Sequence, residues 1–572
     1  MTDIVGSEMV SASRVPKASG LQWLLPQMSI YLWLLLLVIL PNALLIFVSF
    51  LKSSGGLVIY EFNTSNLERI IHSKSVWILL ARTLTASAAS VLLATLIAYP
   101  MAYYAARVLR RGKIMAVLLV AIPLWISLLM RIFAWRLILG ERGILNSVLL
   151  WTGIITEPSD ALLYNQFAVF LTFAYVAIPF IFISVYTAVE RIPGNLVEAA
   201  NDCGAGKWRA FSTVIWPLSR PGLAIGVSLA FLMVVGDYVT PSMVGGLDGT
   251  MLGMVIASQF GLAGNWPYGA ALGLLLLLSA ALLLVVLNVA CRVPGILVSE
   301  GNEAPALSTS TRRSPMARAK SWVGFALFCL PYVFLYAPLA VITLFSFSQD
   351  SVPVFPPSGF TLRWYIELAD NQAMIQSLVR SLVVAGITLA ISIVVGTFFA
   401  VLLAIGRIRG ATVVGSLLLA PVAIPGVIFG ITMVLTFQLL GITNPTVRVV
   451  LGHCTFVMPV IMMVVLNRMR RLDPALAEAS ADLGAHPFKT FYFVLLPLIR
   501  GAIIGGALLG FTLSVDEVIV SIFLTGSEPT LPVWVWNQVR FGFTPSVNAI
   551  FVCIGVGTVL LIVLSRRFIG ER

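Results

Sequence analysis

Long apolar runs separated by short polar segments dominate the pattern of this 572-residue chain. A bilayer core of about 30 Å is crossed by roughly 20 apolar residues in an α-helix, and twelve runs reach that length. They lie at 28–50, 79–106, 114–138, 166–188, 221–244, 269–291, 321–346, 380–405, 412–440, 447–466, 499–525 and 547–567. Strands of a membrane barrel would instead alternate over about ten residues. The pattern therefore predicts twelve transmembrane helices.

One polar segment interrupts this pattern twice, at 198–218 (EAANDCGAGKWRAFSTVIWPL) and at 478–498 (EASADLGAHPFKTFYFVLLPL). The two copies align without gaps at an offset of 280 residues. Farther upstream the offset is 298, as for Pro123 and Pro421, so the first half has an outer loop (139–165) that is longer by 298 − 280 = 18 residues. Six spans per half is an even number, so both halves run in the same direction. We expect an all-α polytopic membrane protein of two parallel six-helix repeats.

Composition and charge predict how the chain divides into halves and how it is oriented in the membrane. Hydrophobic residues are 59% of the chain and charged residues only 10%, too few charges for a soluble protein of this size. The polar segment 292–320 predicts a cytoplasmic linker between a first half at 1–291 and a second half at 321–572. Most of the 36 lysines and arginines fall in loops on the side of the N-terminus, so the positive-inside rule places both termini in the cytoplasm. The net charge of +12 thus reflects topology and is no evidence for nucleic-acid binding.

Each copy of the duplicated segment predicts a helix, a glycine turn and a second short helix. Asn195 is placed to cap the first helix, with Glu198 three residues on as the partner in a capping box. Gly204 and Gly484 stand where a left-handed helix end is needed. An ordinary amphipathic helix on the lipid headgroups would not require the same spacing twice, so we expect a specific protein contact.

The sequence offers no site for enzymatic chemistry. GAGKW at 204–208 is similar to a phosphate-binding loop, but Asn201 stands in place of its first glycine and Trp208 follows the lysine. The five cysteines and three histidines are scattered, which predicts neither a disulfide framework nor a metal site. We expect a chain that hydrolyses no nucleotide itself.

The duplicated segment resembles the cytoplasmic loop signature of bacterial ABC importer permeases, Glu-Ala-Ala followed by glycine, with Ser480 and Leu495 as mild departures. In that family the first short helix, the coupling helix, docks on a separate ATPase. The resemblance assigns this role to Glu198, Ala199, Asp202, Gly204, Glu478, Ala479, Asp482 and Gly484. Two copies imply two ATPase subunits, which would carry the ATP and Mg, whereas this chain needs no cofactor and is not an enzyme.

The resemblance is narrower over several further stretches. RIFAWR at 131–136 and GILN at 143–146 resemble the first permease of spermidine/putrescine-type importers, and GHCTF at 452–456 resembles the second permease. Residues 511–526 and 531–549 also resemble the second permease. The chain therefore resembles a fusion of both permeases. This implies a bacterial inner-membrane location, a periplasmic binding protein as partner, and alternating access for a small solute such as a polyamine.

Ionisable groups inside the spans are candidates for the substrate pathway, because charges are costly in a bilayer. The repeat places Asp237 opposite Glu517, with Asp516 beside it, and aromatic rings could add cation–π contacts. The candidate pathway residues are Trp135, Asp237, Tyr238, Asp516, Glu517 and Trp534. The alternative is that the acids pair with Arg131 or Arg136 and only hold helices together.

Other functions remain open at this stage. Related permeases handle opines, aminophosphonates and ferric iron, so the substrate is not fixed by the resemblance. A secondary transporter driven by an ion gradient could also have two six-span halves, and a channel is a third alternative. Neither would use two docking loops.

Overall fold

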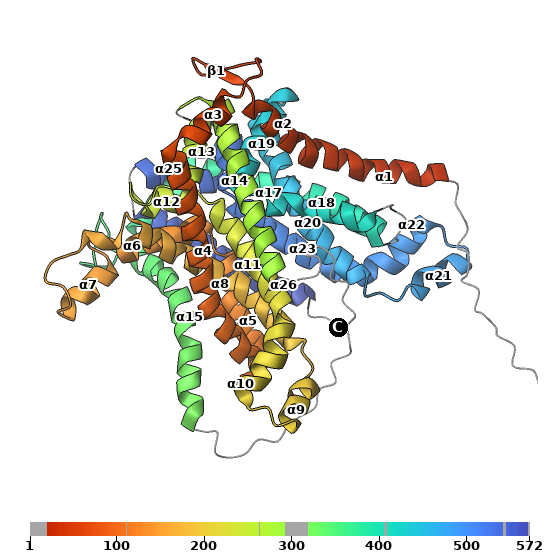
Figure 1. Ribbon diagram of the computed structural model, residues 1–572, viewed down its shortest axis with the longest axis horizontal. Helices are drawn as coiled ribbons and strands as arrows, with labels where there is room; N and C mark the ends of the chain where they lie inside the picture. Colours follow the sequence, from red (N-terminus) through yellow and green to blue (C-terminus); the bar gives the residue numbers. More distant parts are fainter. Residues whose placement is uncertain are drawn as a thin grey trace, which may run out of the picture.

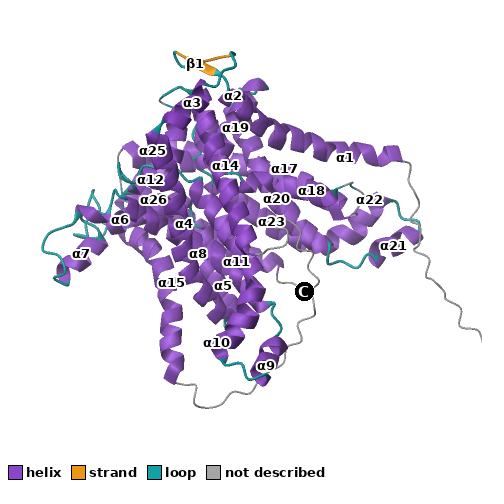
Figure 2. Ribbon diagram, viewed as in Figure 1, coloured by secondary structure: helices purple, strands orange, loops and turns teal. Residues whose placement is uncertain are grey.

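The protein is almost entirely helical (Figure 2). The computed structural model describes residues 20–109, 111–261, 263–291, 319–404, 408, 410–541 and 545–569. Within these ranges one two-stranded hairpin, β1 (Lys52–Ser54) and β2 (Leu57–Ile59), is the exception to the expected all-α fold. Most of the predicted linker, 292–318, lies outside the described residues, as do the first nineteen residues of the chain.

The helices follow the apolar runs of the sequence. Those of the first half are α1 (Gly20–Leu34), α2 (Leu40–Ser49), α3 (Ser65–His72), α4 (Lys74–Tyr103), α5 (Lys113–Ala121), α6 (Leu128–Leu139), α7 (Ile144–Trp151), α8 (Gln166–Glu190), α9 (Gly194–Asp202), α10 (Lys207–Ala210), α11 (Trp216–Val235), α12 (Val239–Val244), α13 (Leu252–Phe260) and α14 (Trp266–Cys291). Those of the second half are α15 (Ala319–Ser346), α16 (Arg363–Asp370), α17 (Gln372–Ala404), α18 (Ala411–Ala423), α19 (Gly426–Leu439), α20 (Pro445–Met469), α21 (Ala475–Asp482), α22 (Pro487–Thr490), α23 (Leu496–Asp516), α24 (Ile519–Leu524), α25 (Leu531–Phe541) and α26 (Ser546–Ile569).

Nine helices of the described residues are long and apolar enough to cross a membrane. Two further pairs reach this length only if each bent pair counts as one span, which gives up to eleven. The twelfth apolar run falls on α26, of which Ser546–Gly557 counts as a shorter apolar helix. By length and composition the structure thus supports 9 to 11 spans, and the expected twelve are not all reached.

The third and ninth apolar runs do not form the continuous helices that the sequence pattern predicts. α5 and α6 meet at 87°, and α18 and α19 meet at 101°. Proline explains the second bend, because Ile424 precedes Pro425 and adopts an extended backbone (φ −81°, ψ 134°) instead of a helical one. In the first bend Ile126 is extended in the same way, with φ −96° and ψ 135°. We call these two bends the entry elbows.

Packing reproduces the internal repeat. In the first half α4 packs along α8 and α11, and in the second half α17 packs along α20 and α23. The paired arginines also have matching roles. Arg82 donates to the carbonyl of Asp248 at 2.8 Å, and Arg380 donates to the carbonyl of Pro529 at 3.3 Å and pairs with Glu528. Two copies of one helical framework therefore make up the described chain.

The longer outer loop of the first half reaches the second half. It carries α7, and its Ser147 hydroxyl donates to the carbonyl of Phe355 at 3.0 Å. The N–H of Phe355 donates in turn to the carbonyl of Arg142 at 3.1 Å. The extra residues predicted from the change of offset thus join the two halves.

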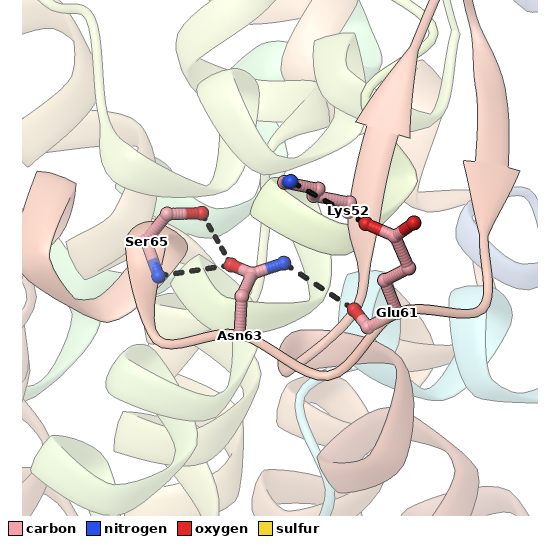
Figure 3. Close-up of polar contacts among 4 residues, drawn as sticks. All are labelled: Lys52, Glu61, Asn63 and Ser65. Carbon is pink, nitrogen blue, oxygen red and sulfur yellow. Dashed lines mark hydrogen bonds and ion pairs between the residues drawn. The ribbon is translucent and has the colours of Figure 1, made fainter.

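The hairpin and the turn that follows it form a small polar structure (Figure 3). Lys52 and Glu61 make an exposed ion pair of 3.4 Å across the hairpin. Asn63 accepts hydrogen bonds from the N–H of Ser65, at 2.9 Å, and from its hydroxyl, and donates to the carbonyl of Glu61 at 3.3 Å. These bonds fix the turn that leads into α3. In Figure 1 the hairpin stands at the top, whereas α9 and α10 lie at the bottom and α21 and α22 at the right.

Candidate functional site

The two copies of the duplicated segment have the same backbone geometry. Gly204 has φ +82° and Gly484 has φ +78°, so both glycines adopt the predicted left-handed conformation. In the first copy the N–H of Ala205 donates to the carbonyl of Ala200 at 3.0 Å, and in the second Ala485 donates to Ser480 at 3.1 Å. These six-to-one bonds define a Schellman motif at the end of α9 and of α21.

All eight residues assigned to coupling are exposed. The side chains of Leu196 and Leu476, which are equivalent at the 280-residue offset, are each 43% exposed, and Trp208 and its counterpart Phe488 are 79% and 70% exposed. Each copy therefore presents two apolar side chains at matching positions beside the acidic residues. We call these two surfaces the docking segments; they are defined by residues 194–210 and 475–490.

Two details of the docking segments differ from the sequence prediction. Asn195 does not cap α9, because the helix begins at Gly194, two residues earlier than that cap requires, with Pro193 at the N-cap position and no side-chain cap bond. Ser480, a departure from the family signature, bonds the hydroxyl of Thr490 at 2.9 Å and ties α21 to α22. In the first copy alanines occupy both equivalent positions, so this hydrogen bond between two hydroxyls belongs to the second copy alone.

Two of the three acids of the proposed pathway cap short helices where the fifth and eleventh spans break. Asp237 accepts hydrogen bonds from the N–H groups of Val239 and Thr240, at 2.8 and 3.0 Å, and from the Thr240 hydroxyl. Glu517 accepts from the N–H of Val520, the counterpart of Thr240, at 2.9 Å. The carboxylates thus satisfy free donors at the first turns of α12 and α24. We call these two breaks the acidic elbows.

Each acidic elbow lies against the entry elbow of the opposite half. A Cβ atom on Gly236 would lie 2.4 Å from the Cβ of Pro425, so this approach requires glycine. At the equivalent place in the other half, Asp516 accepts a hydrogen bond of 3.1 Å from the N–H of Leu128. Because Leu128 is the first residue of α6, its N–H has no partner within that helix. The four elbows therefore meet between the halves.

Arg131 lies one turn into α6 and is only 5% exposed. The negative charges of Asp516 and Asp237 act on it, yet it forms no ion pair with either of them. Ion pairs elsewhere in the described residues join Lys52 with Glu61, Lys113 with Glu190, Arg363 with Glu367 and Arg380 with Glu528. Within the same part of the chain, Arg131 Nε and Nη1 have no hydrogen-bond partner. Arg136 donates instead to the carbonyl of Val539 at 3.4 Å.

The aromatic candidates divide between two places. Trp135 packs on Tyr175 and Phe334, with ring centroids 5.8 and 5.2 Å apart. Tyr238 lies at the acidic elbow of the first half, and its neighbours are Phe523 at 5.9 Å and Trp536 at 6.5 Å. Trp534, the residue named from the sequence, is 8% exposed on the same helix as Trp536. The contact between Trp536 and Tyr238 is evident from the structure and was not predicted from the sequence.

His453 bridges two helices of the second half. It is 1% exposed, and its ring nitrogens bond the hydroxyls of Ser514 at 2.8 Å and Ser521 at 2.9 Å. The imidazole thus fastens α23 and α24 on both sides of the second acidic elbow. Among the described residues, no group of three histidine, cysteine or acidic side chains could hold a metal ion.

A small cavity of about 40 Å³ adjoins Asp516. Its lining combines α23 with α25 and the first entry elbow, and it includes Ser127, Leu129, Thr512, Asp516 and Val535. This volume holds about one water molecule. The cavity beside Asp516 is therefore too small for a polyamine.

Known proteins place the chain in a family. The model of the family described as binding-protein-dependent transport system inner membrane component matches residues 90–293 and again residues 392–570. The spermidine/putrescine transport system permease protein PotB of Haemophilus influenzae is 33% identical over 262 residues, which cover 45% of this chain and 90% of PotB. The putrescine transport system permease protein PotI of Escherichia coli is 37% identical over 229 residues, 39% of this chain and 81% of PotI. The chain belongs to this family and carries its permease domain twice: it is a multi-pass inner-membrane permease of a binding-protein-dependent ABC transporter, related to spermidine/putrescine permeases and not itself an ATPase.

Proposed function

We propose that the protein imports a small organic cation of the polyamine class along a pathway between its two halves. The observation that carries the proposal is the position of Asp237, Asp516 and Glu517, which stand at elbows where the halves meet. Carboxylates are expensive to bury in a membrane, and a passage for cations benefits from them. The similarity to permeases named for spermidine and putrescine supports the same substrate class.

Each half, 1–291 and 321–572, would act as one six-span permease unit, with the linker 292–320 and both termini in the cytoplasm. Each docking segment would then seat one copy of a cytoplasmic ABC ATPase. The matching backbone and exposed side chains of the two segments support this arrangement. When ATP binding brings the ATPases together, the docking segments would move with them and rock the halves about the elbows.

The elbows suggest how the solute would pass. An ionised carboxylate only accepts hydrogen bonds, and an ammonium group only donates them. In the described conformation the Oδ2 atom of Asp516 accepts the N–H of Leu128, whereas its Oδ1 atom has no hydrogen-bond partner among the described residues. An ammonium group of a polyamine delivered by a periplasmic binding protein would bind the Oδ1 atom, with Tyr238 and Trp536 able to contribute aromatic faces. Asp516 would thus bind the substrate at a point where the two halves meet.

A zwitterionic solute, such as an opine or an aminophosphonate, is the second candidate. Arg131 favours it, since a buried guanidinium without a hydrogen-bond acceptor for Nε and Nη1 among the described residues could bind a carboxylate or phosphonate. No comparable observation favours ferric iron.

Transport in reconstituted membranes tests the proposal. The chain, its ATPase and its binding protein would be placed in proteoliposomes, and uptake of labelled putrescine and spermidine would be measured with an opine and an aminophosphonate as competitors. We expect amine uptake that requires both ATP and binding protein. Uptake driven by an ion gradient without ATP would favour a secondary transporter, and competition by the zwitterions alone would favour the second candidate.

A further inference from the structure

Arg131 is the unexplained charge at the centre of the molecule. Its neighbours come from three elements: Asp516 from the end of α23, Asp237 from the break after α11, and Tyr175 from α8. The hydroxyl of Tyr175 donates to the carbonyl of Leu335 at 3.1 Å and is therefore not aimed at Arg131 alone. The guanidinium is buried among acids with which it forms no ion pair in the described part of the chain.

A helix-fastening role does not account for this placement. A buried arginine that holds helices together would make a short ion pair or donate to backbone carbonyls. Arg136, on the same helix, does so through the carbonyl of Val539, whereas Arg131 Nε and Nη1 have no acceptor among the described residues. The equivalent position in the second half, at the 298-residue offset, is Phe429, which is buried. The charge is thus a feature of one half and not a requirement of the repeated fold.

Three carboxylates around one passage raise a physical problem for a polyamine transporter. A passage conducts only if its site binds the ion well enough to admit it and weakly enough to release it. Electrostatic attraction in a desolvated site is much stronger than in water, and it grows with each ammonium group of the solute. Unopposed, the three acids would retain a polyamine with three ammonium groups more tightly than one with two.

We propose that Arg131 is a tethered counter-cation that limits how tightly the acidic elbows hold a polyamine, and so determines release and the preferred number of ammonium groups. The proposal rests on the proposed function, and it adds a specificity-determining residue to the pathway. Arg131 repels the ammonium groups by Coulomb forces without competing for the hydrogen bonds of Asp516. The unpaired Nε and Nη1 and the lack of an ion pair with the acids agree with this role.

Equilibrium binding to the permease–ATPase complex in nanodiscs, without the binding protein, separates this role from a structural one. The probes are labelled putrescine, a diamine, and labelled spermidine, a triamine. We expect Arg131→Gln to bind both more tightly, by about tenfold for the diamine and more for the triamine, while the maximal rate of uptake in proteoliposomes falls. Arg136→Gln is the matched control on the same helix and should leave both affinities unchanged. A residue that only supports the fold would lower uptake without raising affinity.

Unchanged binding of both amines by Arg131→Gln would overturn the proposal. Weaker binding would also overturn it, and would assign Arg131 to direct contact with the substrate. If this variant does not assemble, the double variant Arg131→Gln/Asp516→Asn removes one charge of each sign. We then expect affinities within about threefold of the wild type, because the net charge of the site is unchanged; a larger change contradicts the proposal. If the wild-type complex neither binds nor transports either amine, the proposed function itself has failed. If the wild type transports both amines normally and Arg131→Gln binds them with unaltered affinity, only the counter-cation role of Arg131 is rejected.

Discussion

The carboxylate of Asp516 accepts a hydrogen bond from the N–H of Leu128, 388 residues earlier in the chain, and so joins the second half to the first. The equivalent contact in the other half pairs Gly236 with Pro425 through close packing and no charge. The repeat is therefore symmetric in backbone and asymmetric in chemistry. By contrast, the capping bonds of Asp237 and Glu517 stay within their own halves.

Asp516→Asn should reduce polyamine uptake while the complex stays stable. An amide oxygen still accepts the N–H of Leu128, but the attraction for an ammonium group is lost. Asp516→Ala should in addition lower stability by about 1–3 kcal/mol, since it leaves the N–H of Leu128 without its partner. Uptake of labelled putrescine and thermal unfolding of the purified complex measure the two effects. If Asp516→Asn transports normally at normal stability, this carboxylate is not part of the pathway.

Removing the caps of the acidic elbows should destabilise the protein. Asp237→Ala and Glu517→Ala each delete the acceptor for a helix N-terminus, which typically costs about 1 kcal/mol. Asp237→Asn keeps an acceptor and should unfold at nearly the wild-type temperature. Glu141→Ala, which removes an exposed carboxylate from the outer loop, is the control. Equal melting temperatures for all four variants would mean that the caps do not stabilise the elbows.

Valine at the docking glycines should uncouple transport from ATP hydrolysis. Gly204 and Gly484 are left-handed, and a residue with a Cβ atom is disfavoured there by about 1–2 kcal/mol although the surrounding space is open. The double variant should insert normally but lose substrate uptake. The double variant Gly153→Val/Gly441→Val is the matched control, because these glycines are also left-handed with open space but lie outside the docking segments. Normal uptake by the Gly204→Val/Gly484→Val variant would exclude a coupling role for this geometry.

The two halves should work as separate chains. Residues 1–305 and 306–572, expressed together, are expected to restore an active importer because the linker would only tether them. The relatives support this expectation, since PotB is matched over 90% of its length by less than half of this chain. Inactivity with both fragments present in the membrane would show that residues 292–320 have a structural task.

Local sequence signals predicted most of the long helices and the left-handed docking glycines. Run length alone marks a membrane helix, and Gly204 stands at a helix end that can be read from its neighbours. The bends at Ile126 and Ile424 were not predicted, although Pro425 within the ninth run was a usable signal. The partners of Asp516, His453 and Tyr238 could not be derived at all. They come from distant segments, and only the packing of the two halves determines which side chains meet.

The number of ATPase subunits on one permease chain tests most directly the claim that this protein is two coupled permeases in one polypeptide. Native mass spectrometry of the purified transporter, formed with its ATPase, measures this number. We expect one 61.8 kDa permease chain with two ATPase chains, and one ATPase fewer when either docking segment is disrupted by its glycine-to-valine change. A complex with two permease chains for two ATPases, or a permease that binds no ATPase, would contradict this claim.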